Sequence, residues 1–113
     1  MVSIETVRKF ALSFPETDEH PHFDKKAFRV KKKIFITITE KEKRVMVKLS
    51  LTDQSVFCSF DKNIIYPVPG AWGRLGCTLI DLSKIKTAML KDAVTMAYCN
   101  VAPPKLADPY RPV

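Results

Sequence analysis

The sequence predicts one compact domain of the α+β class, in which an antiparallel β-sheet carries N-terminal and C-terminal helices packed on one face. Three observations support this class. The chain has 113 residues, a common size for one domain, and no glycine- or serine-rich linker divides it. Apolar and polar residues alternate between residues 27 and 49, as in strands with one buried face. Segments on either side repeat apolar residues at helical spacing.

The first predicted helix lies in SIETVRKFALSFP, residues 3–15. Ser3 is suited to cap its N-terminus, and Pro15 ends it. One face of this helix carries the apolar residues Ile4, Val7, Ala11 and Phe14. Residues 16–24 are polar and interrupted by Pro21, which predicts a loop.

Three strands are expected next, as an antiparallel meander with one buried face. The side chains predicted to face outward are Arg29, Phe35, Thr37, Met46 and Lys48. The turns fall at residues 31–33 and 40–43, and neither contains Gly or Asn, so turns looser than a tight hairpin are expected. An alternative also stays open, in which a helix buries Phe35 and Met46.

The next segment, LTDQSVFCSFDKN at residues 51–63, predicts a short helix. Thr52 or Asp53 would cap it, and Val56 and Phe60 would pack inward. Brief strands are then expected in IIYPVP and in CTLIDL.

The longest predicted helix is SKIKTAMLKDAVTMAYCN, residues 83–100, with Ser83 as its N-cap. The remaining residues, 103–113, are rich in proline and predict an extended tail.

Positive charge is concentrated in one segment of the chain. The protein has a formal charge of +7, but residues 25–48 hold ten basic and two acidic residues, a net +8, which leaves the rest at −1. Cations at hairpin turns can contact nucleic-acid phosphates and release counterions. The same pattern also occurs where charged turns only keep sheet edges soluble. Both interpretations stay open from charge alone.

All three glycines lie in YPVPGAWGRLGC, around the single tryptophan, Trp72. The spacing matches neither a dinucleotide-binding fingerprint nor a phosphate-binding P-loop. One interpretation is a shaped loop that presents Tyr66, Trp72 and Arg74 to a partner. The other is that Trp72 plugs the end of the core while the glycines let the chain turn.

The sequence shows no catalytic signature and predicts no metal site and no cofactor. His20, His22 and Asp24 alternate along the chain, but no further cluster completes a metal site. The three cysteines stand far apart without a CxxC pair, which favours reduced thiols in a cytoplasmic protein. No segment is apolar enough to span a membrane, and no signal pattern opens the chain.

Three segments resemble the MmcQ/YjbR family of small bacterial proteins, namely ALSFPETDEHPHFDKKAFRVKKKIFITI, DQSVFCSFDKNIIYPVPGAWGRLGCTLIDL and LKDAVTMAYCNVAPPKLA. The resemblance covers nearly the whole chain. It implies a domain similar in shape to the frataxin-like CyaY fold, with two β-hairpins that project as wings toward DNA. An iron role is not expected, because the acidic residues near the N-terminus are few and lie close to basic ones.

Together these observations predict a non-enzymatic DNA-binding protein, with a monomer favoured. The residues expected to contact nucleic acid are Arg29, Lys31, Lys32, Lys33, Lys41, Lys43, Arg44 and Lys48. This prediction requires that the two basic turns project together into solvent. The alternative is a module for a protein or small ligand, centred on Tyr66, Trp72 and Arg74, with the lysines serving solubility only.

Overall fold

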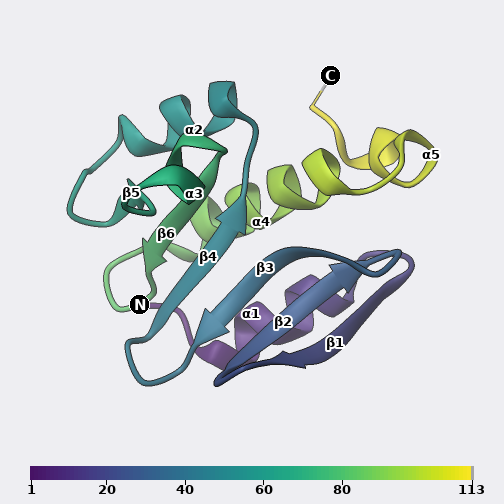
Figure 1. Cartoon of the computed structure of the whole chain (residues 1–113), viewed down its shortest axis with the longest axis horizontal. Coiled ribbons are helices and arrows are strands. Elements are labelled where there is room, and N and C mark those ends of the chain that lie inside the picture. Colours follow the sequence, from purple (N-terminus) through teal and green to yellow (C-terminus); the bar gives the residue numbers. More distant parts are fainter. Residues whose placement is uncertain (113) are drawn as a thin grey trace.

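The computed structural model describes residues 1–112 and contains a six-stranded antiparallel sheet with helices (Figure 1). In chain order the elements are α1 (Ile4–Leu12), β1 (Thr17–His22), β2 (Lys25–Val30), β3 (Lys33–Thr39), β4 (Arg44–Lys48), α2 (Leu51–Cys58), β5 (Ile65–Pro67), α3 (Ala71–Arg74), β6 (Cys77–Asp81), α4 (Thr87–Val101), α5 (Pro104–Ala107) and the 3₁₀ helix η1 (Asp108–Tyr110). The strands are ordered β1-β2-β3-β4-β6-β5. The predicted α+β class is confirmed.

Helices α1 and α4 cover one face of the sheet. Figure 1 shows both of them behind the strands, with α4 crossing the middle of the molecule. The core lies in this layer, where α4 buries Leu90, Val94 and Tyr98 against the sheet. The opposite face of β3 and β4 has no helix over it within residues 1–112, and we call it the open face.

An aromatic cluster joins both ends of the chain to the core. Tyr98 stacks on Phe14 at 4.4 Å between ring centroids and meets Phe35 edge-on at 5.6 Å. The Tyr98 hydroxyl donates a hydrogen bond of 2.8 Å to the carbonyl of Pro15, which satisfies the one polar group of this ring. Tyr110 packs edge-on against Phe14 at 5.0 Å.

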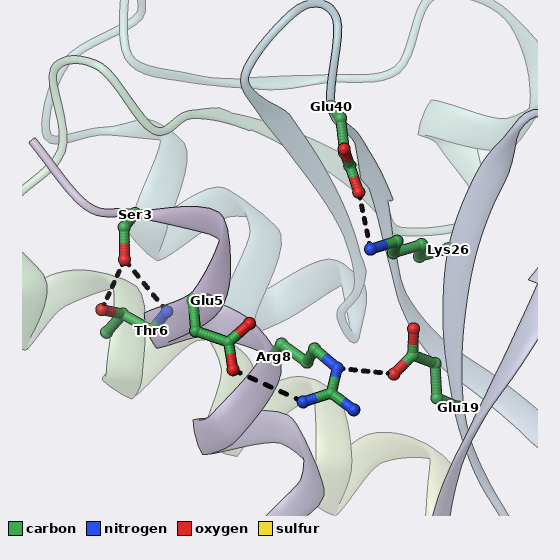
Figure 2. A network of polar contacts seen from close by, with 7 residues as sticks. All are labelled: Ser3, Glu5, Thr6, Arg8, Glu19, Lys26 and Glu40. Atoms are coloured by element: carbon green, nitrogen blue, oxygen red, sulfur yellow. Dashed lines mark hydrogen bonds and ion pairs between the residues drawn. The ribbon is translucent and has the colours of Figure 1, made fainter.

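The segment predicted as a loop at residues 16–24 contains strand β1 instead. It pairs with β2 along its whole length and forms the edge of the sheet. Pro21 fits there, because an edge strand has N–H groups that need no ladder partner. The ion pair from Arg8 of α1 to Glu19 of β1, 2.7 Å long, ties this edge to the helix layer (Figure 2).

A β-bulge corrects the predicted faces of β3. Phe28 pairs with Ile36 and Arg29 pairs with Ile34, so Phe35 is an extra residue in β3. Phe35 therefore joins Ile36 in the core, fully buried, and the prediction that it faces outward is wrong. Ile34 takes the open face in its place.

The turn between β2 and β3 is tighter than predicted. Val30 pairs with Lys33, which leaves a two-residue turn of Lys31 and Lys32, with φ of 50° and 69°. Two lysines thus take the left-handed conformation in which Gly or Asn is more usual. The turn between β3 and β4 spans four residues, 40–43, and is looser, as expected.

The short helix α2 differs from its prediction in both its cap and its buried side. Ser50 caps it, accepting a hydrogen bond of 3.1 Å from the Asp53 N–H. Val56 and Phe60 are exposed, 53% and 63%, and the buried residue is Gln54. The helix is short and packs beside β5 at the sheet margin, so few of its residues can reach the core.

The last helix and the tail also depart from the sequence prediction. Helix α4 begins after Lys86, not after Ser83, because the Asp81 carboxylate accepts hydrogen bonds from the Ser83 N–H and hydroxyl and holds a turn there. The residues predicted as an extended tail instead form α5 and η1, and Ala107 is buried. Val113 of that tail lies outside the described residues.

Candidate binding face

A groove of about 810 Å³ runs across the open face. Its floor consists of residues of three adjacent strands that point away from the helix layer. Successive side chains alternate in β4 and β6, and in β3 the bulge at Phe35 puts both Ile34 and Thr37 on this face. The floor residues include Ile34, Thr37, Met46, Lys48, Cys77 and Leu79. An apolar floor with cations at its margins can hold a flat apolar group that carries negative charge.

Phe23 forms one rim of the groove. It lies in the two-residue turn between β1 and β2, where His22 pairs with Lys25. The side chain is 94% exposed, and its ring meets the His22 ring edge-on at 4.9 Å. Its φ of 59° is strained for a bulky residue, so the position would suit Gly better in terms of stability.

Trp72 of α3 forms the opposite rim, and its side chain is 65% exposed. It does not plug the end of the core, so that interpretation of the glycine-rich loop is wrong. The loop around it is closely packed, since a Cβ at Gly73 would lie 1.9 Å from the Val68 carbonyl oxygen. Gly76 has φ of 104°, and a Cβ there would lie 1.9 Å from the Leu49 carbonyl oxygen. The loop therefore holds Trp72 at a fixed place.

The buried amide of Gln54 fastens this loop to α2. Its Nε2 donates to the carbonyl of Gly73 at 2.9 Å, to the carbonyl of Cys77 at 3.2 Å and to Thr78 Oγ1 at 3.2 Å. Sequence analysis missed Gln54, because a glutamine in a helix gives no sign of being buried.

Arg44 lies at the end of the groove near Phe23. Its guanidinium donates to the Glu42 carboxylate and, over 2.9 Å, to the Tyr66 hydroxyl. The hydrogen bonds to Glu42 and Tyr66 raise the pKa of Arg44 above its usual value. Of the three loop residues predicted to contact a partner, Trp72 lines the groove, Tyr66 is engaged by Arg44, and Arg74 is exposed outside the groove lining.

Lysines stand at both ends of the groove. Lys25 lies beside Phe23, and Lys48 pairs with Cys77 near Trp72. Lys41 lines an adjoining crevice of about 370 Å³ that shares Phe23 and Lys25 with the groove. Burial raises the pKa of the Cys77 thiol, opposed by nearby Lys48, so this thiol stays protonated near neutral pH.

The two basic turns lie at opposite ends of β3, and the expectation that they project together is wrong. Figure 1 shows the turn at residues 31–32 and the turn at residues 40–43 at the two ends of this strand. Seven residues at about 3.3 Å each separate them by roughly 20 Å. Consecutive turns of an antiparallel meander always alternate between ends.

Four of the ten basic residues in the segment 25–48 are ion-paired. Arg29 holds the Asp18 carboxylate with bonds of 2.8 and 3.1 Å, and this hydrogen bonding lowers the pKa of Asp18. The other three pairs are Lys26–Glu40 at 2.8 Å (Figure 2), Lys31–Glu16 at 3.5 Å and Arg44–Glu42. Within residues 1–112, Lys25, Lys32, Lys33, Lys41, Lys43 and Lys48 have no carboxylate partner.

The part of the chain that the structure describes holds no group of three His, Cys, Asp or Glu side chains suited to a metal ion. Among the same residues, no helix has the length and apolar character that crossing a bilayer requires.

The comparisons agree with this fold. The family model described as YjbR matches residues 12–100. The chain belongs to the YjbR family. A crystal structure from Deinococcus radiodurans, of protein DR2400 with the family-model domain DUF419, is similar with a TM-score of 0.77 at 14% identity. The likeness covers 89% of this chain and 79% of that one. No curated protein matches this YjbR-family chain.

At 14% identity the DR2400 likeness concerns the fold alone, so the binding face rests on the side chains described above. Phe23 was the functional candidate that sequence analysis overlooked. The available signal was an aromatic residue in a polar stretch next to the basic segment, in HPHFDKK.

Proposed function

We propose that this YjbR-family protein binds DNA, chiefly through contacts between its lysines and backbone phosphates. The observation that carries this proposal is the group of six lysines in the segment 25–48 that have no carboxylate partner within residues 1–112. Unpaired ammonium groups on a surface attract a polyanion without first breaking an internal ion pair. Arg29, Lys31 and Arg44 have weaker roles, because each already engages a carboxylate.

The separation of the two basic turns limits how DNA can lie. A molecule that touches both turns must follow β3 for roughly 20 Å, along or across the open face. This direction passes Lys48 and the groove. No catalytic step forms part of the proposal, since the thiol in the groove, Cys77, is kept neutral by burial.

The test is the salt dependence of binding to a fluorescently labelled short duplex, followed by anisotropy. Contacts with four to six phosphates give a slope of log K against log salt of about −3.5 to −5.5. Replacing Lys31, Lys32 and Lys33 together with Ser should make the slope shallower by about 2, because Lys31 is paired with Glu16 and two free lysines are lost.

The matched control replaces Lys84, Lys86 and Lys105 with Ser, which removes the same charge outside the basic segment. It should change the slope by less than about 1. Absence of binding at low salt would refute the proposal, and so would equal effects of the two triple variants.

A second function is favoured by one observation, the exposure of Trp72 beside the groove. In this function the open face binds a protein segment or a small ligand, and the lysines serve solubility. Binding that is insensitive to salt but lost on Trp72→Ala would support this second function over DNA.

A further inference from the structure

We infer that the groove on the open face binds single-stranded DNA, with unpaired bases stacked on Phe23 and Trp72. This inference rests on the proposed function and specifies the form of the ligand. Phe23 and Trp72 line one groove from opposite rims, and both rings are exposed.

The exposed Phe23 side chain does not stabilise the folded protein. The ring is 94% exposed, buries almost no surface, and stands at a φ that costs free energy for a bulky residue. The turn would form more readily with Gly at this position. A strained, solvent-exposed aromatic residue beside a groove is instead suited to stacking on a ligand.

Trp72 is held in place from behind. Gly73 and Gly76 pack directly against the backbone, and the Gln54 amide bonds the loop. Because the backbone around Trp72 is fixed, base stacking restricts only the torsions of the indole side chain itself. The two rims are three strand spacings apart across the sheet, from β2 to β6, or about 14 Å, and they also lie toward opposite ends of the strands, so each ring stacks on a different base.

Cations outnumber carboxylates in the groove lining, where Lys25, Arg44 and Lys48 lie with Asp24 and Glu42, and this excess favours a chain of phosphates over a neutral ligand. Lys25 lies at the Phe23 rim with Lys41 in the adjoining crevice, and Lys48 lies toward the Trp72 rim. Cations beside aromatic platforms are the arrangement with which proteins bind single strands. The phosphates of a duplex could contact the lysines, but its bases could not stack on Phe23 and Trp72, because they are paired and stacked inside the duplex.

The experiment compares a labelled 12-mer oligothymidylate with a 12-base-pair duplex by anisotropy at one salt concentration, using Phe23→Gly and Trp72→Ala. Oligothymidylate should bind the wild type at least fivefold more tightly than the duplex does. Each variant should weaken oligothymidylate binding by about 5- to 150-fold, the effect of losing one stacked base. The slope with salt should stay the same, since no cation is removed.

Three controls keep this outcome interpretable. Phe60→Ala removes an aromatic ring that is 63% exposed but lies outside the groove lining, and it should change affinity less than twofold. Trp72→Phe should restore most of the affinity lost in Trp72→Ala. Phe23→Gly should not lower the urea midpoint, because Gly suits the positive φ.

The inference would be overturned, and the proposed function left standing, if the duplex bound as tightly as oligothymidylate or more tightly. The same holds if both rim variants, Phe23→Gly and Trp72→Ala, kept the affinity of the wild type. Tighter binding of a 12-mer oligouridylate would overturn the assignment to DNA. Absence of binding by every probe at low salt would overturn the inference and the proposed function together.

Discussion

Gln54→Met tests whether the buried amide holds the Trp72 loop, because methionine keeps the length of the side chain and removes its hydrogen bonds. Nε2 has two hydrogens shared among three acceptors, so at most two bonds of full strength are lost. The carbonyls of Gly73 and Cys77 keep other donors, at 3.0 Å each, so no buried carbonyl is left unpaired. At about 0.5–1.5 kcal/mol per bond, the free energy of unfolding should fall by about 1–3 kcal/mol.

Urea denaturation followed by circular dichroism measures this loss. With a slope of about 1.5 kcal/mol per molar urea, a loss of 2 kcal/mol lowers the midpoint by about 1.3 M. The indole of Trp72, the single tryptophan, reports on the loop itself. Its fluorescence anisotropy should fall in the variant as the ring gains freedom.

Ser55→Ala is the control on the same helix, because Ser55 is exposed, and it should change stability by less than about 0.5 kcal/mol. A Gln54→Met protein with unchanged stability and unchanged Trp72 anisotropy would refute the conclusion that this amide positions the loop.

Further changes probe the backbone, the core and the ion pairs. Gly76→Ala should lower the free energy of unfolding, measured in urea, by more than about 2 kcal/mol, because the added Cβ would clash with a backbone carbonyl. Gly70→Ala should lower it by only about 1 kcal/mol, because Gly70 has a φ of 85° but open space around it. Equal losses in the two variants would contradict this account. Tyr98→Phe should cost about 1–2 kcal/mol through the lost bond to a backbone carbonyl, and a thermal midpoint equal to wild type would contradict it. Arg29→Gln should raise the pKa of Asp18 toward its ordinary value, as measured by carboxyl NMR. Because the pKa of Asp18 is lowered in the folded state, the Arg29–Asp18 pair stabilises the fold at pH values above the unfolded-state pKa. This stabilisation is lost as the pH falls through the folded-state pKa.

The sequence predicted the class and most elements because their apolar periodicity is strong. Helix α1 begins after Ser3 as expected, since that hydroxyl accepts the Thr6 N–H at 3.1 Å. The alternation along β4 also predicted its faces, with Val45 and Val47 buried. In these elements local propensity and tertiary packing favour the same conformation.

The faces of β3 could not be predicted, because nothing local in the sequence indicates the bulge at Phe35. Counting in twos places Phe35 outward, whereas the ring packs with Tyr98, a residue from the other end of the chain. Strand β1 was missed for a similar reason, since its polar residues form a strand only by pairing with β2. For the candidate site as well, the local features could be predicted from the sequence, whereas the features set by tertiary packing could not.

The concentration of positive charge in residues 25–48 was evident from the sequence. The placement of the two basic turns at opposite ends of β3 depends on the topology of the sheet. The exposure of Trp72 depends on how α3 packs, and the role of Phe23 depends on the β1–β2 turn. Tertiary context decides which polar and aromatic side chains share a surface.

The central claim is that the open face between Phe23 and Trp72 is the binding surface, and residue-resolved NMR tests it most directly. Backbone amide shifts of the ¹⁵N-labelled protein are followed while oligothymidylate is added. The account predicts that the largest changes fall at residues 22–25, along β3 and β4, and in the loop around Trp72. Changes confined to the outer surfaces of α1 and α4, or to the turn at residues 31–32 alone, would contradict it.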